Sequence, residues 1–370
     1  MSQNLSLSYD DIGIVPSIVS SIRSRSQCNV LDENGYLPIF ASPMDTVINE
    51  KNILIFLNNK INVIVPRTIE ITHRITIGSI YNIFIALSMD EAVLLLNHDV
   101  NSPIFPKVLP LKICVDIADG HMQDYINLLK SLKEKFNDKI LLMGGNIANP
   151  ETYRIYDEIG CDYVRCGIGG GDACLTSSNT GIYYPYFSLI EKIFKIKSDI
   201  NGKCKIIADG NIRGYRDIQK ALNFADYVMI GSLFNRSLES AGKTIYGKCY
   251  WVIRNLKIFR PIKTFLLYGK QVDQFNEKIK KDWSKGKITL LKEFYGMSTK
   301  KAQKAINPNA KKLKTSEGLI KYQKVEHTIG GWTENEIDYL KSAMSYTNSH
   351  SLDEYKNNDY VIITKLRHNN

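Results

Sequence analysis

Eight short apolar segments, rich in isoleucine and valine, recur between residues 37 and 231, and helix-like stretches separate them. A continuous apolar run of this kind is typical of a strand buried on both faces, as in a parallel sheet. Eight such strands alternating with helices predict an α/β fold, a closed (β/α)8 TIM barrel. The pattern alone leaves a doubly wound sheet open as the alternative. The predicted strands are 37–42, 62–66, 82–88, 112–117, 139–144, 162–167, 204–209 and 226–231, and the amphipathic stretches between them include 123–136, 150–159 and 217–224.

The composition excludes several other classes of protein. A chain with 44% hydrophobic and 23% charged residues is neither disordered nor collagen-like. No apolar run approaches the roughly 18 residues that a membrane span needs, and residues 1–5 do not begin a secretory signal. We therefore expect a soluble cytoplasmic protein with no membrane partner. The seven cysteines include no CxxC pair and the six histidines no HxxH pair, so we expect neither a disulfide framework nor a zinc site.

One basic segment carries all of the net charge of the chain. Residues 243–292 contain 13 Lys and Arg against 3 Asp and Glu, and the remaining basic and acidic residues cancel. Such a segment could bind a phosphate group, contact a polyanion such as nucleic acid, or form a solvated loop. The rhythm of strands and helices also breaks after Gly242. We predict a barrel body over 1–242, a basic insertion with an active-site lid over 243–320, and a C-terminal extension over 321–370 that packs on the barrel.

Polar residues and glycines follow most of the predicted strands. In a (β/α)8 barrel the carboxyl ends of the strands face one mouth, and that mouth holds the chemistry. Because polar residues or glycines follow six of the predicted strands, we predict an active site at this mouth. The residues concerned are 42–45, Asp116, 145–146, 167–176, 209–211 and 231–232.

The segment 167–176, Gly-Ile-Gly-Gly-Gly-Asp-Ala-Cys-Leu-Thr, is the most informative of these ends. Its glycines permit positive φ and let the backbone approach a ligand closely. Successive N–H groups in such a loop form an anion site, and its carbonyls can coordinate a monovalent cation. A cysteine on the loop, Cys174, is a candidate nucleophile. A tight strand-to-helix turn is the alternative interpretation of the same residues.

Together with six further motifs, this loop resembles the IMP dehydrogenase/GMP reductase family. The motifs are Ser42-Pro-Met-Asp-Thr-Val47, Gly144-Gly-Asn146, Ala208-Asp-Gly210, Met229-Ile-Gly-Ser-Leu233, Glu239-Ser-Ala-Gly242 and Tyr295-Gly-Met297, in family order from about Leu7 to Thr364. The resemblance implies a (β/α)8 barrel that binds a purine nucleoside monophosphate at its mouth. It also implies hydride transfer between C2 of the purine and a nicotinamide cofactor, and a homotetramer.

The resemblance carries roles over to individual residues. It implies that Cys174 attacks C2 and that Asp209 holds the ribose hydroxyls, while Asp116 and Asn146 lie near the nicotinamide. It implies a monovalent cation, K⁺, held by the backbone carbonyls of Gly169, Gly171 and Cys174. It implies that Ser42 and the backbone of Gly231 and Ser232 bind the phosphate, and that Met297 and Ser298 contact the base. The remaining substrate-binding residues that it implies are Met44, Gly210, Ser316 and Gly318.

Three features favour the reductase branch of the family. Only fifteen residues separate Pro66 from Asn82, which leaves no room for the CBS modules that dehydrogenases usually carry. No arginine lies between Met297 and Glu317, where the dehydrogenase lid has an Arg-Tyr pair, and 294–298 with 316–318 resembles the reductase lid. The reductase converts GMP to IMP with NADPH, and Thr176 and Glu317 match the pair that handles the proton for the leaving amine.

Two alternatives stay open from the residues. Ser42-Pro43 is more typical of dehydrogenases, so a dehydrogenase without CBS modules, converting IMP to XMP with NAD, is the second reading. The third is an inactive barrel that serves as a binding subunit.

Several positions depart from the family pattern. Asp172 stands where the family has a phosphate-binding serine, and a carboxylate about 4 Å from a phosphate costs about 1–4 kcal/mol per unit charge. Asn211 replaces a glycine, and 66–68 replaces a His-Lys pair. Tyr183 and Tyr186 replace a glycine and a glutamine. We predict that Lys and Arg side chains of 243–292 reach the mouth and offset Asp172.

Overall fold

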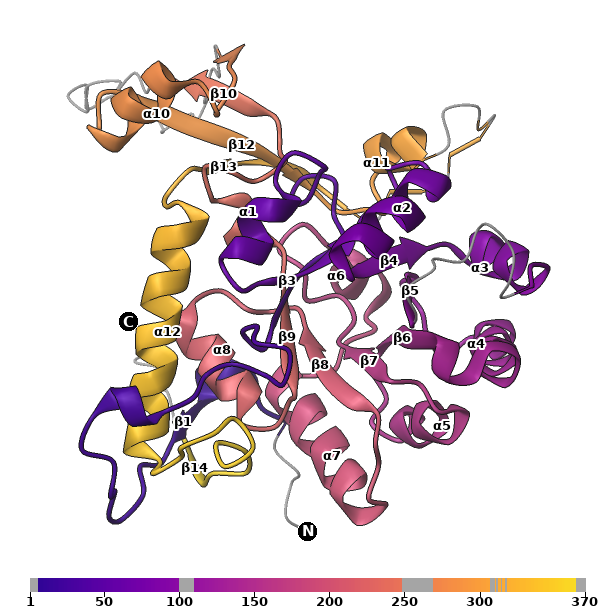
Figure 1. Cartoon of the computed structure of the whole chain (residues 1–370), viewed down its shortest axis with the longest axis vertical. Coiled ribbons are helices and arrows are strands. Elements are labelled where there is room, and N and C mark those ends of the chain that lie inside the picture. The colour runs from indigo at the N-terminus through magenta and orange to yellow at the C-terminus, as the bar shows by residue number, and fades with distance from the viewer. Residues whose placement is uncertain are drawn as a thin grey trace, which may run out of the picture.

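The structure is a computed structural model that describes residues 6–99, 110–247, 269–306, 310, 312–313, 315–316 and 318–363. Eight parallel strands close into a barrel in chain order, which confirms the (β/α)8 prediction over the doubly wound alternative (Figure 1). The strands are β2 (Ile39–Ala41), β3 (Asn62–Val65), β4 (Phe84–Leu87), β5 (Leu111–Val115), β6 (Ile140–Ile147), β7 (Tyr163–Cys166), β8 (Lys205–Asp209) and β9 (Tyr227–Ile230). Each of the eight predicted apolar segments overlaps one of these strands, although β5 begins one residue before its segment and β6 ends three residues after its own.

Helices surround the barrel because each has one apolar face. In α4 the buried positions Tyr125, Leu128, Leu129, Leu132 and Phe136 recur at helical spacing. The helices are α1 (Ile53–Asn58), α2 (Ile71–Tyr81), α3 (Met89–Leu96), α4 (Gln123–Phe136), α5 (Thr152–Ile159), α6 (Thr176–Thr180), α7 (Tyr186–Asp199), α8 (Tyr215–Leu222) and α9 (Ser232–Asn235), with 3₁₀ turns at Tyr9–Asp11, Arg25–Gln27 and Asn137–Lys139.

Aromatic side chains fill the inside of the barrel. Phe40 packs on the rings of Phe84, Tyr163 and Tyr227 with centroids 5.2–6.1 Å apart, mostly edge to face. All four side chains are buried. The barrel is therefore a packed core rather than a channel, and a ligand can bind only at its rims.

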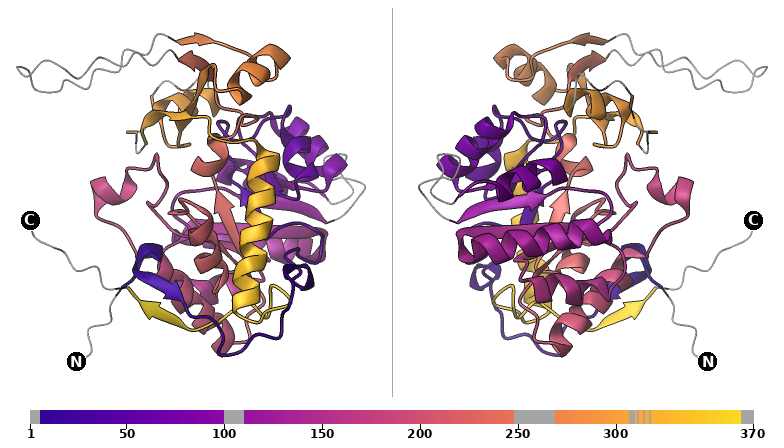
Figure 2. Two further views of the ribbon diagram at one scale, coloured as in Figure 1. Left: turned by 90° about the vertical axis from the view of Figure 1, so that its left-hand side faces the viewer. Right: turned by 90° about the vertical axis from the view of Figure 1, so that its right-hand side faces the viewer.

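A four-stranded antiparallel sheet follows the barrel, in the order β11-β10-β12-β13. Figure 2 shows this sheet and its helices as a layer at the top of the view, above the barrel. The sheet extends across residue 320 into the C-terminal part of the chain. Its elements are β10 (Thr244–Gly247), β11 (Gly269–Gln271), α10 (Glu277–Ser284), β12 (Thr289–Tyr295), α11 (Lys300–Ile306) and β13 (Ile320–Lys324). Part of the predicted basic segment, 248–268, lies outside the described residues.

The C-terminal part of the chain packs along the side of the barrel, where α12 (Ile329–Tyr346) lies beside α8 (Figure 1). Trp332 of α12 stacks on Tyr215 with ring centroids 5.5 Å apart and meets Phe234 edge to face at 4.8 Å. The last strand, β14 (Tyr360–Ile362), pairs antiparallel with β1 (Ile12–Ile14). Among the described residues, no helix has the length and apolar character that crossing a membrane would require.

Candidate active site

The loop after β7 can be built only with glycine at several positions. Gly167 has a φ of 135°, and a Cβ there would lie 2.3 Å from a ring carbon of Tyr186 and 2.4 Å from the carbonyl oxygen of Asp209. A Cβ on Gly170 would lie 2.2 Å from the Tyr186 hydroxyl oxygen. Tyr186 is itself buried, so its ring supports the loop from below. The tyrosine that replaces the family's glutamine thus fills the space under the glycines.

Cys174 is the partly exposed thiol of this loop. Its sulfur donates to the Thr176 hydroxyl over 3.3 Å, and its backbone N–H donates to the Gly171 carbonyl over 2.9 Å. The other described cysteines are 28, 114, 161, 166 and 204, and all are buried. Burial raises the pKa of the Cys114 thiol to about 12. A buried thiol of this kind is not a nucleophile near neutral pH, whereas Cys174 is accessible at the mouth.

The lid contacts the cysteine loop directly. Cys174 and Gly318 form an antiparallel bridge, and the Leu319 N–H donates to the Ala173 carbonyl over 2.9 Å. The bridge is tight, because a Cβ on Gly318 would lie 2.8 Å from the Thr299 methyl carbon and 3.3 Å from the Ser298 hydroxyl oxygen. The predicted lid residues Ser298 and Gly318 therefore lie beside Cys174.

Two further lid residues complete this side of the site. Ser316 closes a short turn by donating from its hydroxyl to the Gly318 carbonyl over 2.9 Å. Met297 lies in the turn between β12 and α11 and is half-buried. Glu317 lies outside the described residues, so its proposed role stays a prediction.

Charged side chains from four strand ends form one network across the mouth. Arg165 Nη1 lies 2.5 Å from Asp116 Oδ1, and its Nη2 lies 2.9 Å from Asp209 Oδ2. Arg67 Nε donates to the other oxygen of Asp116 over 3.2 Å. Burial alone would raise the pKa of Asp116, but the guanidinium groups of Arg165 and then Arg67 hold it below its ordinary value. Arg165 thus holds both aspartate side chains in fixed positions, and the two arginines favour the ionised form of Asp116.

Asn146 joins this network to the glycine loop. Its Nδ2 donates to Asp209 Oδ2 over 2.7 Å and to the Gly167 carbonyl over 2.8 Å. The pairing of β6 with β7 shifts register between Gly145 and Ile147, and such a shift re-aims the side chain within it. The structure therefore brings together Asp116, Asn146 and Asp209, all predicted from the sequence.

Two arginines of the network had no predicted role. Arg165 places a charge among the apolar residues of the run 162–167. A charged residue inside a predicted buried strand is rare, so this feature of the sequence could have indicated a functional side chain. Arg67 stands in the 66–68 segment that departs from the family, and the sequence gives no indication of its partner.

The residues predicted to hold the phosphate also lie together. A Cβ on Gly231 would be 3.0 Å from the Met44 sulfur and 3.4 Å from the Ser42 hydroxyl oxygen. The next residue, Ser232, donates from its hydroxyl to Asp172 Oδ2 over 3.0 Å. The cation nearest that carboxylate is Lys321, with its Nζ 3.5 Å from Oδ1. In the described part of the chain, Asp172 is thus offset by β13 rather than by the segment 243–292.

The loop after β8 completes this rim. Gly210 has a φ of 117°, and a Cβ there would lie 2.9 Å from the Tyr186 hydroxyl oxygen. Asn211 has a φ of 57° and donates from its backbone N–H to the Gly170 carbonyl over 3.0 Å. Asparagine tolerates this left-handed conformation better than most residues, which explains how it replaces the family's glycine.

Two of the three carbonyls predicted to hold K⁺, those of Gly169 and Gly171, already accept hydrogen bonds within the loop. The Ser177 hydroxyl donates to the Gly169 carbonyl over 3.0 Å, and the Cys174 N–H donates to that of Gly171. Each carbonyl keeps one further lone pair, so the cation stays a prediction. Within the described ranges, no group of three or more His, Cys, Asp or Glu side chains could hold a metal ion.

The donors and acceptors at the mouth fit a nicotinamide. A carboxylate offers about four acceptor positions, and Arg165 and Arg67 each engage one oxygen of Asp116. The same carboxylate therefore keeps acceptor capacity for the N–H of a carboxamide.

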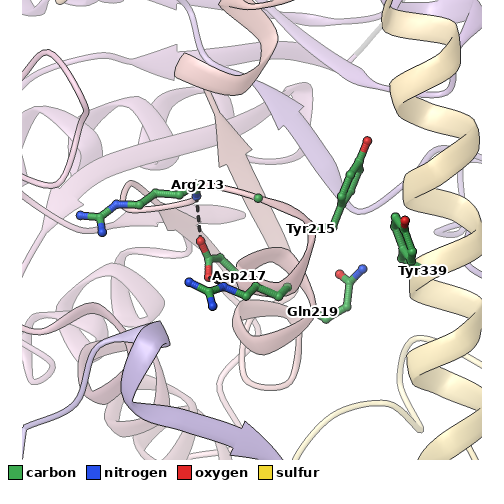
Figure 3. Close-up of a pocket in the computed structure, with 7 residues that line it drawn as sticks. Arg213, Tyr215, Asp217, Gln219 and Tyr339 are labelled. Atoms are coloured by element: carbon green, nitrogen blue, oxygen red, sulfur yellow. Dashed lines mark hydrogen bonds and ion pairs between the residues drawn. The ribbon is translucent and has the colours of Figure 1, made fainter. Parts of the chain in front are cut away.

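A second hollow, of about 490 Å³, lies between α8 and α12 (Figure 3). Its lining includes Arg213, Tyr215, Gln219 and Tyr339, and the Arg213 N–H donates to Asp217 over 2.9 Å. None of the predicted site residues lines it. Because the thiol and the ion-pair network lie at the barrel mouth, we place the candidate active site there.

Comparison with known proteins gives an independent view of this chain. A sequence model of the IMP dehydrogenase / GMP reductase domain matches residues 112–260. Proteins named GMP reductase from Staphylococcus aureus strains JH9, N315 and Newman are each 33% identical to it over 250 residues. The matched region is 65% of this chain and 75% of each relative.

Proposed function

Since the chain belongs to the IMP dehydrogenase / GMP reductase family, we propose that it is an NADPH-dependent reductase that deaminates the guanine ring at C2 and converts GMP to IMP. The balanced reaction is GMP + NADPH + 2 H⁺ → IMP + NADP⁺ + NH₄⁺. The observation that carries the proposal is the half-buried Cys174, in contact with Thr176 on a glycine loop and bridged to the lid at Gly318.

The cysteine divides one difficult substitution at C2 into two easier steps. The Cys174 sulfur adds to C2, and the C2–N bond then breaks so that the amine leaves as ammonia and a thioimidate remains. Thr176 donates to the departing nitrogen, and Glu317 replenishes its proton. Bound NADPH would supply the hydride to C2, after which the C2–S bond breaks and the thiolate is regenerated.

The ion-pair network positions the other groups. In this proposal Asp209 accepts hydrogen bonds from the ribose hydroxyls. Asp116 and the Oδ1 atom of Asn146, whose two N–H groups are already engaged, accept from the N–H groups of the nicotinamide carboxamide. Arg165 keeps both aspartate side chains fixed, because it is shared between them. Preorganised groups of this kind need little rearrangement during the reaction.

The direction of the reaction follows from the lid. A dehydrogenase must activate water to hydrolyse the thioimidate, and the family does this with an arginine of the lid. The sequence between Met297 and Glu317 holds lysines and no arginine, which supports reduction over hydrolysis. The relatives at 33% identity are also named GMP reductase. Conversion of IMP to XMP with NAD is the second candidate, supported by Ser42-Pro43.

Selective alkylation of the thiol separates an enzyme from an inactive barrel. We expect iodoacetamide to modify Cys174 before the buried cysteines, and GMP to protect it, in peptide mass spectrometry of the intact protein. An unreactive Cys174, or one that GMP does not protect, together with no oxidation of NADPH, would favour the binding subunit. The homotetramer, the cytoplasmic location and K⁺ remain predictions; light scattering and activity in K⁺ against Na⁺ test the first and last.

A further inference from the structure

A carboxylate occupies the rim where the family's phosphate-binding serine is expected. Asp172 Oδ2 accepts from the Ser232 hydroxyl over 3.0 Å and from Gln323 Nε2 over 2.9 Å. The same Gln323 nitrogen lies 2.9 Å from the Ser232 oxygen, so the three side chains form a closed triangle. The hydroxyl of Ser232, whose backbone the resemblance implies as a phosphate ligand, is therefore already engaged by an acidic group of the protein.

The charges at this rim are balanced without a ligand. Lys321 forms an ion pair with the Asp172 carboxylate at 3.5 Å and also donates to its backbone carbonyl. Among the described residues it is the cation paired with Asp172. A nucleoside monophosphate brings a charge of about −1.5 to −2 near neutral pH. Binding it here would set two anions against one lysine.

The hydrogen-bonding groups lead to the same conclusion. The Asp172 carboxylate is an acceptor, and Gln323 has a buried carbonyl oxygen with no hydrogen-bond partner among the described residues. An ionised phosphate offers acceptors only, whereas a free 5′-hydroxyl is both donor and acceptor. The rim therefore presents acceptors, and a ligand that can donate a hydrogen bond fits it better than a ligand that can only accept one.

We propose that Asp172 turns the site towards purine nucleosides, so that guanosine is a better substrate than GMP for the same reductive deamination. This rests on the reductive deamination at C2 put forward under the proposed function and changes its preferred substrate, because the chemistry at C2 does not depend on the group at the 5′ position. The balanced reaction is guanosine + NADPH + 2 H⁺ → inosine + NADP⁺ + NH₄⁺. Asp172 is here a specificity-determining residue and takes no part in bond making or breaking.

The test compares kcat/KM for guanosine with kcat/KM for GMP in three full-length proteins. They are the wild type, Asp172→Asn, which removes the charge but keeps the shape, and the control Asp353→Asn, which removes a carboxylate that is 95% exposed on the C-terminal part. We expect the guanosine-to-GMP ratio to exceed one in the wild type and in the control. In Asp172→Asn we expect it to fall about tenfold, which corresponds to about 1.4 kcal/mol.

A wild-type ratio below one, or a ratio that Asp172→Asn changes less than threefold, would overturn the inference while leaving the reductase intact. Loss of turnover with both compounds would instead refute the proposed function. In that case the dissociation constants of inosine and IMP are measured by calorimetry in the same three proteins. The inference then requires that inosine binds more tightly than IMP in the wild type and that Asp172→Asn reduces this preference at least threefold.

Discussion

The sulfur of Cys174 lies 3.3 Å from the hydroxyl oxygen of Thr176, two residues along the chain and at the first position of α6. In the proposed mechanism the sulfur attacks C2, and a hydroxyl this close to the sulfur is also close to that carbon. The contact would then place a proton donor within reach of the amine that leaves C2.

Replacing Thr176 with valine removes the hydroxyl and keeps the shape of the side chain. We expect kcat to fall about 100-fold with little change in KM, which is typical of the loss of a general acid or its relay. Steady-state kinetics with NADPH measures both parameters. The control is Thr180→Val on the exposed side of the same helix. An equal fall in kcat in the two variants would show that the effect comes from disturbing helix α6 and not from loss of the Thr176 hydroxyl proton.

Replacing Arg165 with methionine leaves Asp116 and Asp209 buried without their shared partner. Breaking a buried ion pair in this way costs about 3–5 kcal/mol, so we expect a loss of this size in urea unfolding. Arg154→Met, at an exposed helix pair, is the control and should cost less than about 1 kcal/mol. A small loss in Arg165→Met would mean that water already screens the network.

The same arginine should affect acid stability. The folded pKa of Asp116 lies below its ordinary value of about 3.9, so its contribution is present above that pH and is lost as the pH falls further. Without Arg165 the folded pKa rises, and we expect the acid transition to begin at higher pH. Thermal unfolding from pH 3 to 6 checks this, and unchanged profiles would contradict the assignment.

Lys292 of β12 is fully buried, and its Nζ donates to the Ser240 carbonyl over 2.7 Å. Burial lowers its pKa to about 7. The unfolded chain, with a lysine pKa of about 10.4, binds more protons between these values, so the free energy of unfolding should increase on the order of 1 kcal/mol per pH unit from about pH 7 to 10. Lys292→Met should flatten this slope, whereas Lys270→Met on an exposed part of β11 should retain it. The same slope in all three proteins would refute a neutral buried lysine.

The tight contact between the lid and the cysteine loop can be tested by a pair of substitutions. Gly318→Ala places a Cβ 2.8 Å from the Thr299 methyl carbon, and we expect kcat to fall at least tenfold because the lid is displaced from Cys174. Thr299→Ser removes that methyl and keeps the hydroxyl that donates to Gly296. The double variant should regain part of kcat. No recovery would mean that the clash at Thr299 is not the cause.

Local sequence patterns predicted the barrel well because each strand is a short apolar run that needs no knowledge of its neighbours. Each of the eight runs overlaps a strand, and the helix predicted at 123–136 is α4. The loop before Cys174 could also be predicted from its glycines, because a positive φ restricts a position largely to glycine. The sheet of β10–β13 was expected only as a basic lid, because its antiparallel pairs join residues far apart in the sequence.

Contacts between distant segments account for what the sequence did not predict. Asp172 was identified as a misfit, but its partners Lys321 and Gln323 lie about 150 residues away, on a strand whose position no local pattern reveals. Arg67 and Arg165 similarly meet only because closure of the barrel brings their strand ends to Asp116.

The central claim is that a sulfur–carbon bond forms at Cys174 during reduction at C2 of a guanine ring. The most direct measurement offers the purified protein GMP, and separately guanosine, with NADPH, and follows both the absorbance of the reduced nicotinamide and the release of ammonium. We predict equal amounts of NADPH oxidised and ammonium released by the wild type, and neither by Cys174→Ser. Turnover that survives in Cys174→Ser, or a wild type that reduces neither compound but oxidises IMP with NAD, would contradict the account.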